Sequence, residues 1–300
     1  MFVTTDCDET DQDLGNYERF LDQDITSINY MTTGRVYQTV IQKERNLEYD
    51  GKCVQVVPHI PEEVIHRIKA SADHAKADIT VIEIGGTVGE YENLLFLEAV
   101  RMLKFEQPDD VAVVLVSYLP IPKTMGEMKT KPTQHAARAL NATGVLADFI
   151  VARAEKVLDP PRLEKLARFC NIRRDAAISA PDVANVYEVP IGFTDQEFDV
   201  KLLRLLGLDP KTPDLQPWRE LIHKVRSFEK LVNIAVVGKY FGTGHYTLAD
   251  SYISVIEAVK HASWANGVKP KFTWIDAEKF EKDPAKIDEL KGYDGIIVPG

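Results

Sequence analysis

Short, continuous runs of apolar residues alternate along the chain with amphipathic helical patterns, and this alternation restricts the possible folds more than any other feature. Strands buried on both faces and separated by helices are typical of a parallel sheet that helices cover on both sides. The sequence therefore predicts an α/β fold. The segments that we expect to contain strands are 79–84, 111–119, 148–154, 176–190, 232–240, 271–277 and 293–300.

The chain has 300 residues, which is long enough for two domains. Its composition changes where "LDPKTPDLQPW" carries three prolines in eleven residues, a pattern typical of a linker. We expect a first domain over 1–207, a linker over 208–230 and the start of a second domain over 231–300. The second domain reaches only its third expected strand, so we expect its sheet to be incomplete.

The charge balance narrows the range of partners. The chain has 46 Asp and Glu against 36 Lys and Arg, a formal net charge of −10. No basic face is implied, so we do not expect a nucleic acid as the main partner, whereas a local lysine cluster could bind a small anion. No apolar run reaches the roughly 18 residues of a membrane-spanning helix. Three widely spaced cysteines fit reduced thiols, so we expect a cytoplasmic protein.

The segment "GEMKTKPTQHAARAL" places two lysines and a proline at the start of a helical pattern. Pro132 suits the first helical position, where its missing N–H group costs nothing. The free N–H groups at a helix start attract anions. Lys129 and Lys131 are unfavourable beside this dipole unless an anion is bound, and Thr133 and Gln134 add hydrogen-bond donors. The pattern favours a polyphosphate site over the alternative, a solvated pair of loop lysines.

Two acidic stretches are candidate metal ligands. Glu83, in "EIGGTVGEYEN", lies near the tip of an expected strand, and ligands of open α/β sheets bind outside the carboxyl ends of strands. A carboxylate there can bind Mg²⁺ that bridges phosphates. The alternative is a glycine-rich turn with a solvated glutamate. Near the start of the chain, Asp13 follows four further acidic residues, Asp6, Asp8, Glu9 and Asp11, and one of these five is a candidate second ligand. The alternative is a solvated acidic loop that caps the next helix.

Several motifs together resemble one known family. "DLGNYERF", "TTGRVYQTVIQKER", "EIGGTVGEYEN", "GEMKTKPTQH", "FCNI", "VYEVP", "VVGKY" and "SYISVIEAVKHA" follow one another as in the CTP synthase family, and the similarity covers essentially the whole chain. The resemblance implies a P-loop-NTPase-like parallel sheet in a synthase domain, followed by the start of a flavodoxin-like class I glutamine amidotransferase domain. It also implies a ligase that forms a C–N bond: ATP phosphorylates UTP, and ammonia from glutamine displaces the phosphate to give CTP.

The resemblance also assigns roles to residues. It implies Mg²⁺ as the metal, with Asp13 and Glu83 as ligands, and ATP as a co-substrate bound by Asp13, Asp182 and Val183. It implies a homotetramer with UTP, CTP, ATP and glutamine as partners. The residues implied to bind UTP or CTP are Lys129, Thr130, Lys131, Pro132, Thr133, Gln134 and Lys165, and those implied for feedback CTP are Glu90, Tyr91 and Glu92.

The chain departs from the family pattern in four places. Glu90-Tyr91-Glu92 replaces the usual Asp-Ile-Glu, Pro181 replaces a frequent lysine, and the loop before "LADSY" is longer. The sequence also contains no GxxxxGK[ST] phosphate loop and matches the family only between its P-loop lysine and its Cys-His-Glu triad. We therefore expect no catalytic residue in this chain, and a chain that is inactive and prone to aggregate when alone. The alternative is a non-catalytic assembly subunit that binds UTP or CTP.

Overall fold

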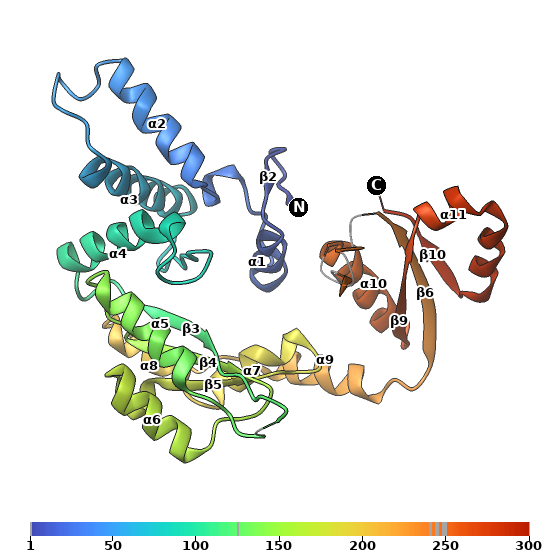
Figure 1. Cartoon of the computed structure of the whole chain (residues 1–300). Coiled ribbons are helices and arrows are strands. Elements are labelled where there is room, and N and C mark those ends of the chain that lie inside the picture. The colour runs from blue at the N-terminus through green and yellow to red at the C-terminus, as the bar shows by residue number, and fades with distance from the viewer. Residues whose placement is uncertain (1, 125, 240–241, 244–245, 248–250, 300) are drawn as a thin grey trace. The chain divides into compact units, whose positions relative to one another are not determined.

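The computed structural model describes residues 2–124, 126–239, 242–243, 246–247 and 251–299. The chain divides into two compact units, residues 31–219 and residues 1–30 together with 220–300. Each unit is described by itself (Figure 1). The helices and strands alternate as expected, and both larger sheets are parallel, which confirms the α/β class.

The unit formed by residues 31–219 is built around a parallel three-stranded sheet. The strands β3 (Val114–Tyr118), β4 (Phe149–Ala154) and β5 (Ala177–Pro181) follow one another in this order across the sheet. Leu115 of β3 pairs with Ile150 of β4. Parallel neighbours need a crossover connection, and here each crossover is a helix. All three strands fall inside segments in which the sequence predicts them.

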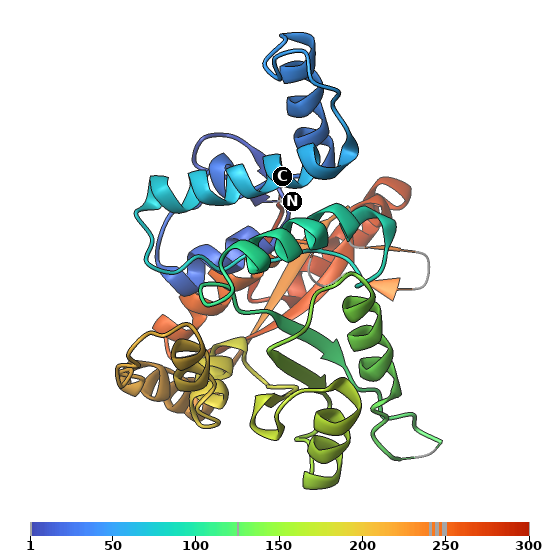
Figure 2. The same cartoon turned by 90° about the vertical axis from the view of Figure 1, so that its left-hand side faces the viewer.

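Helices cover both faces of this sheet (Figures 1 and 2). On β4, Ile150 and Ala152 face one core, which includes residues of α5 (Lys131–Ala142) and α6 (Pro160–Cys170). The neighbouring Phe149 and Val151 face a second core, against which Phe193 of α7 (Val189–Thr194) and Phe198 of α8 (Phe198–Leu205) pack. Successive side chains of a strand point to opposite faces, so a strand buried on both sides is continuously apolar.

A helical layer precedes the sheet within the same unit. It contains α2 (Thr33–Arg45), α3 (Val56–Ala75) and α4 (Leu94–Glu106). Their core includes Val36 and Val40 of α2, Val64 of α3 and Leu103 of α4. Leu97 of α4 belongs instead to the core of the sheet, so α4 connects the two cores.

The strand that the sequence predicts at residues 79–84 does not form. This segment has no regular secondary structure, and the side chain of Val81 is 92% exposed. A β-strand requires hydrogen bonds from a neighbouring strand. Within the part of the chain that the structure describes, no strand pairs with this segment, and β3 pairs only with β4. The apolar run is therefore present without the ladder that would make it a strand.

The second unit contains another parallel sheet, in which β6 (Leu231–Gly238) lies between β9 (Lys269–Asp276) and β10 (Gly295–Ile297). Ala235, Val237 and Ile275 form its core. The spacing of apolar residues in "LADSYISVIEAVKHA" predicts a helix from residue 248; residues 248–250 lie outside the described part, and the described helix begins at Ile253. The remaining elements of this unit are α10 (Ile253–Ala265), α11 (Glu278–Lys282), β7 (Gly242–Thr243), β8 (Tyr246–Thr247), β1 (Phe2–Val3), β2 (Glu9–Thr10) and α1 (Asp13–Leu21).

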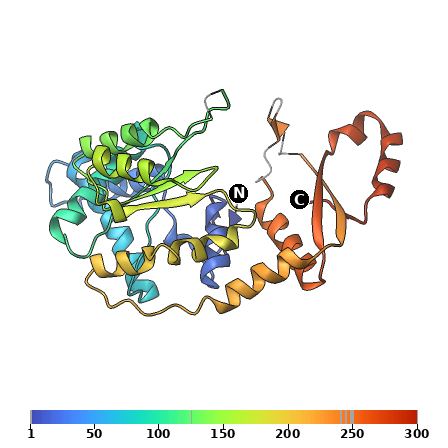
Figure 3. The same cartoon turned by 90° about the horizontal axis from the view of Figure 1, so that it is seen from below.

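The expected linker contains a helix. Residues 207–215 form no helix or strand, and they lead into α9 (Gln216–Ser227), as Figure 3 shows. The domain bounds expected from the sequence stay a prediction. Among the described residues, no helix combines the length and apolar character needed to cross a membrane.

Candidate anion-binding site

The lysine-rich segment follows the carboxyl end of β3. The Leu119 N–H donates to the carbonyl of Arg153 at 2.7 Å, and the Lys129 N–H donates to the carbonyl of Pro120 at 2.9 Å. The first bond holds Leu119 against the end of β4, and the second holds Lys129 beside Pro120, so the chain lies close to the sheet just before α5 begins. The first helical residue is Lys131, so Pro132 occupies the second position rather than the predicted first. A proline is compatible with this first turn because the N–H group that it lacks would have no partner inside the helix.

The side chain at the helix start does not cap the free N–H groups of α5. Thr130 is the N-cap residue, but its side chain makes no capping hydrogen bond. Its Oγ1 instead accepts a hydrogen bond from Gln134 Nε2 at 3.0 Å. The helix start therefore keeps the partial positive charge of its first N–H groups.

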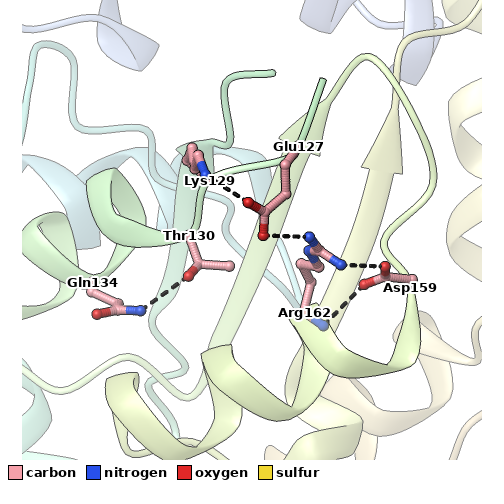
Figure 4. A network of polar contacts seen from close by, with 6 residues as sticks. All are labelled: Glu127, Lys129, Thr130, Gln134, Asp159 and Arg162. Carbon is pink, nitrogen blue, oxygen red and sulfur yellow. Dashed lines mark hydrogen bonds and ion pairs between the residues drawn. The ribbon is translucent and has the colours of Figure 1, made fainter. Parts of the chain in front are cut away.

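A surface pocket of about 380 Å³ lies at this helix start, between the segment that leads into α5 and the helix α6. Three lysines, Lys129, Lys131 and Lys165, lie in its lining, and Figure 4 shows part of its polar network. The pocket thus joins Lys165 to a segment more than thirty residues earlier in the chain. The part that Lys165 plays in UTP or CTP binding stays a prediction. The residues that line the pocket are Glu127, Met128, Lys129, Thr130, Lys131, Gln134, Lys165 and Phe169.

Two residues of the predicted segment do not line the pocket in the described part of the structure. Pro132 is exposed outside it. Thr133 is fully buried, and its Oγ1 accepts a hydrogen bond from Ser117 Oγ of β3 at 2.9 Å. Thr133 therefore positions the first turn of α5 on the sheet.

A chain of ion pairs leads from Lys129 and Glu127 in the pocket lining to Arg162 and Asp159 outside it (Figure 4). Lys129 Nζ lies 2.6 Å from Glu127 Oε2, and Arg162 Nη2 lies 2.7 Å from Glu127 Oε1. Arg162 Nη1 also pairs with Asp159 Oδ2 at 2.6 Å. The hydrogen bond and charge of Lys129 hold the pKa of Glu127 below its ordinary value, and the charges of Arg162 and Lys165 act in the same direction. Glu127 therefore stays ionised in the pocket.

Gln134 contributes a buried polar atom without a partner. Its side chain lines the pocket and the residue is 4% exposed. Its Oε1 accepts no hydrogen bond from the described residues. Buried polar atoms are nearly always hydrogen-bonded, so this oxygen is suited to accept an N–H or O–H group from a bound molecule.

Sequence reasoning missed Glu127 and Arg162. Glu127 belongs to the "GEMKTKPTQ" motif, in which the electrostatics of a helix start point to the lysines and not to an acidic residue. Arg162 lies three residues before Lys165, one helical turn away, and that spacing was the available signal. The sequence could also have identified Asp159 as the cap of a helix, because an aspartate directly before two prolines is typical of a helix start. In the structure its side chain accepts a hydrogen bond from the Arg162 N–H at the start of α6.

The two candidate metal ligands lie in different units. Asp13 is the first residue of α1, whereas Glu83 is exposed in the segment without secondary structure. Their shared Mg²⁺ ion stays a prediction. The described residues contain no group of three or more His, Cys, Asp and Glu side chains placed to hold a metal ion.

The candidate feedback residues lie at the start of a short 3₁₀ turn, Tyr91–Asn93, just before α4. Glu90 Oε2 accepts a hydrogen bond from the Thr87 N–H at 3.2 Å, and Asn93 Nδ2 donates to the Thr87 carbonyl at 2.7 Å. The residue Tyr91 is 91% exposed. Glu92 is also exposed, and the part that these residues play in CTP binding stays a prediction.

Asp182 and Val183 directly follow β5, and both are exposed. The Asp182 N–H donates to the Ala154 carbonyl at the end of β4 at 2.8 Å, and its Oδ1 pairs with Arg153 at 3.2 Å. Pro181 is the last residue of β5. This is the edge of the sheet at which ligands of α/β proteins bind. Their contact with ATP stays a prediction.

A larger hollow of about 550 Å³ lies at the opposite, amino end of β5. It includes Ala177, the first residue of that strand, together with Arg174, Asp175 and Lys201. It contains none of the residues that the sequence predicts for a site. The smaller, lysine-rich pocket is therefore the candidate site.

Parallel sheets between helices, with a cationic pocket beyond the carboxyl end of a strand, define an α/β protein with a site suited to an anionic ligand. The sequence pattern of the family described as "CTP synthase N-terminus" matches residues 1–208. The chain belongs to the CTP synthase family.

Known relatives agree with this assignment. The chain is 48% identical over 301 residues to a CTP synthase of Thermococcus gammatolerans, 43% over 300 residues to one of Methanosarcina acetivorans and 42% over 301 residues to one of Gloeothece citriformis. Each match covers 100% of this chain, and it covers 55%, 55% and 53% of the respective relatives. The chain thus spans about half the length of the curated relatives that it matches.

Proposed function

We propose that this chain is part of an enzyme of pyrimidine nucleotide biosynthesis that converts UTP to CTP with ATP and ammonia derived from glutamine. The observation that carries the proposal is the pocket at the start of α5, which gathers Lys129, Lys131 and Lys165 in a chain of the CTP synthase family. In this proposal the pocket holds the triphosphate of UTP, or of CTP as the product that feeds back.

The chemistry of the pocket suits a triphosphate. Three ammonium groups and the uncapped start of α5 offer positive charge to several phosphate oxygens at once. Lysines near a helix start destabilise it unless an anion is bound, so the ligand would relieve an unfavourable interaction. The unpartnered Oε1 of Gln134 would accept one hydrogen bond from a ligand donor.

The proposal extends to ATP and Mg²⁺. The carboxylates of Asp13 and Glu83 are oxygen donors of the kind that Mg²⁺ prefers. Both are proposed to hold the ion, which would supply positive charge to the phosphates of ATP. Asp182 and Val183 are proposed to lie beside the adenine, and Glu90, Tyr91 and Glu92 to contact feedback CTP. A homotetramer is proposed from the family alone.

A second candidate function is a non-catalytic subunit that binds UTP or CTP and assembles with a longer partner. The favouring observation is the lysine pocket, which can bind a nucleotide without any catalytic residue. Formation of CTP from UTP, ATP and ammonium by the product of the complete gene, rather than by this chain alone, distinguishes the two. Turnover by that product supports the enzyme, whereas nucleotide binding without turnover supports the subunit.

Calorimetric titration with CTP tests the pocket itself. Lys131→Ala is expected to weaken CTP binding about tenfold or more, because a charged hydrogen-bond donor to phosphate is lost. Lys69→Ala is the matched control, since Lys69 is an exposed lysine of α3 that does not line the pocket. Equal CTP affinities of the two variants would refute the proposed triphosphate site.

A further inference from the structure

The carboxylate of Glu127 bridges two cations that come from different elements. Its Oε2 lies 2.6 Å from Lys129 Nζ, in the segment before α5, and its Oε1 lies 2.7 Å from Arg162 Nη2, on α6. Each carboxylate oxygen thus contacts one cation. A phosphate group, which also presents several oxygens around one centre, could contact the same lysine and arginine in place of the carboxylate.

The position of Glu127 in the pocket is consistent with a replaceable group. Its side chain is 47% exposed and lines the pocket together with Lys129. It is the only acidic residue among the residues that line this pocket in the described structure. Arg162, by contrast, has a side chain that is only 19% exposed and a second carboxylate partner, Asp159. Loss of the Glu127 contact therefore leaves Arg162 paired.

We propose that Glu127 is an internal counter-ion of the pocket, and that a triphosphate binds Lys129 by displacing the Glu127 carboxylate. This inference rests on the proposed triphosphate site and adds a residue that sets its affinity. Before the ligand arrives, Glu127 neutralises part of the charge that Lys129 and Lys131 bring to the start of α5.

Displacement is feasible because the pair between Glu127 and Lys129, whose side chains are 47% and 32% exposed, is weak, and because Arg162 keeps Asp159 as a partner. Exposed ion pairs contribute little to stability, since both partners are well solvated when apart. A triphosphate brings several negative charges to the same place and gains the pairs that the carboxylate gives up. The free Glu127 side chain, already half exposed, is expected to turn to solvent. The carboxylate therefore lowers the affinity of the pocket without closing it.

The test compares Glu127→Gln with Glu164→Gln in the whole chain by calorimetric titration, with inorganic tripolyphosphate and with CTP as probes. Glu164→Gln changes the net charge equally, and Glu164 lies on α6 outside the pocket lining. We expect Glu127→Gln to bind both probes about 3- to 10-fold more tightly than wild type, because the carboxylate that competes for Lys129 is removed. We expect Glu164→Gln to change the affinity less than about twofold.

A double-mutant cycle separates displacement from a general change in charge. If Glu127 competes for Lys129, the gain from Glu127→Gln is expected to shrink in a Lys129→Gln background, because the pair to be broken is already absent. A gain of the same size in both backgrounds would overturn the inference. Circular dichroism of all variants checks that the fold is retained.

The outcomes also separate this inference from the proposed function. If wild type binds CTP and the two glutamate variants bind equally well, the displacement mechanism is wrong and the triphosphate site stands. If neither wild type nor Glu127→Gln binds either probe, the triphosphate site and the mechanism that rests on it both fail.

Discussion

Ser117 of β3 donates a hydrogen bond to Thr133 of α5 across 2.9 Å, and Thr133 is completely buried. The bond joins the strand to the first turn of the helix that carries Lys131 and Gln134. It therefore fixes the helix start against the sheet without using a residue of the pocket itself.

Replacement of Thr133 by valine tests this positioning role. Valine keeps the shape of the side chain but leaves the Ser117 hydroxyl without its partner, which is expected to lower the free energy of unfolding by about 1–3 kcal/mol. Urea unfolding measures the loss. CTP affinity is expected to fall only modestly, because no ligand contact is removed. The double variant Ser117→Ala, Thr133→Val is expected to recover part of the lost stability, because no hydroxyl is then left without a partner. If Thr133→Val instead abolished CTP binding and left the stability unchanged, Thr133 would be a direct ligand contact.

Lys165→Gln is expected to weaken CTP binding about tenfold, because Lys165 lines the pocket from α6 and offers its charge to a phosphate. The dependence of affinity on salt is also expected to fall, since one screened charge is removed. Titration at low and high ionic strength measures both effects. The control is Arg168→Gln, an exposed cation of the same helix outside the pocket lining. Similar losses in both variants would mean that only the overall charge of α6 matters.

Glu63 is a buried carboxylate that joins α2 to α3. Its side chain is 4% exposed, and it pairs with Lys43 at 2.6 Å and with Arg67 at 2.8 Å. Glu63→Gln is expected to lower the free energy of unfolding by about 1–3 kcal/mol, because two charge-assisted hydrogen bonds are weakened. Glu62→Gln, which changes an exposed neighbour, is the control in the same denaturation experiment. Equal effects of the two substitutions would contradict a structural role for the buried pair.

The same carboxylate predicts how stability changes with pH. Burial favours the neutral form of Glu63, but the hydrogen bonds and charges of Lys43 and Arg67 outweigh burial and lower its pKa from the ordinary 4.5. A lowered folded-state pKa contributes stability above pH 4.5, and this contribution is lost as the pH falls through the folded pKa. Between about pH 6 and about pH 3, wild type is therefore expected to lose more of its free energy of unfolding than Glu63→Gln, because the glutamine does not titrate. Parallel pH profiles of the two proteins would contradict this prediction.

Asp6 has a lowered pKa for a different reason. The Ser27 hydroxyl donates to Asp6 Oδ2 at 2.6 Å, Thr4 and the Ser27 N–H also donate to the carboxylate, and the Asp6 pKa falls from 3.8 to about 2. This group stabilises the fold above pH 3.8 and loses its effect as the pH falls towards 2. Carbon-13 NMR of the carboxyl group is expected to show a midpoint near 2 in wild type. Ser27→Ala is expected to raise it towards 3.8, and a wild-type midpoint already at 3.8 would refute the prediction.

The local sequence pattern predicted most of the strands, but it could not show which apolar segments find a neighbouring strand to pair with. The apolar run of β4 follows directly from burial on both faces, with Phe149 in one core and Ile150 in the other. The equally apolar run at 79–84 is not a strand, because strand formation depends on a neighbour that local sequence does not specify. The helix α9 was not predicted, because the three prolines of this region indicated a linker. One of them, Pro217, is the second residue of α9, a position that suits proline at a helix start.

For the lysine-rich pocket, too, the local sequence predicted only what depends on neighbouring residues. Lysines beside a proline and a helical pattern predicted a cationic pocket, because helix-start electrostatics depend on neighbouring residues alone. The pairing of Glu127 with Arg162, 35 residues apart, depends on how α6 packs beside α5. Its prediction therefore required the tertiary structure. The burial of Thr133 was likewise beyond local pattern, because the segment alone does not reveal which side of the first turn faces β3.

The position of β3 at the outside of its sheet has a consequence for handling the protein. Among the described residues its only strand partner is β4, so its other side presents backbone N–H and C=O groups beside the exposed side chain of Val116. Such a border is a template onto which a strand of another molecule can be added. We expect intermolecular β-pairing to begin there as concentration rises, and a lysine at position 116 to delay it by placing like charges on opposing copies.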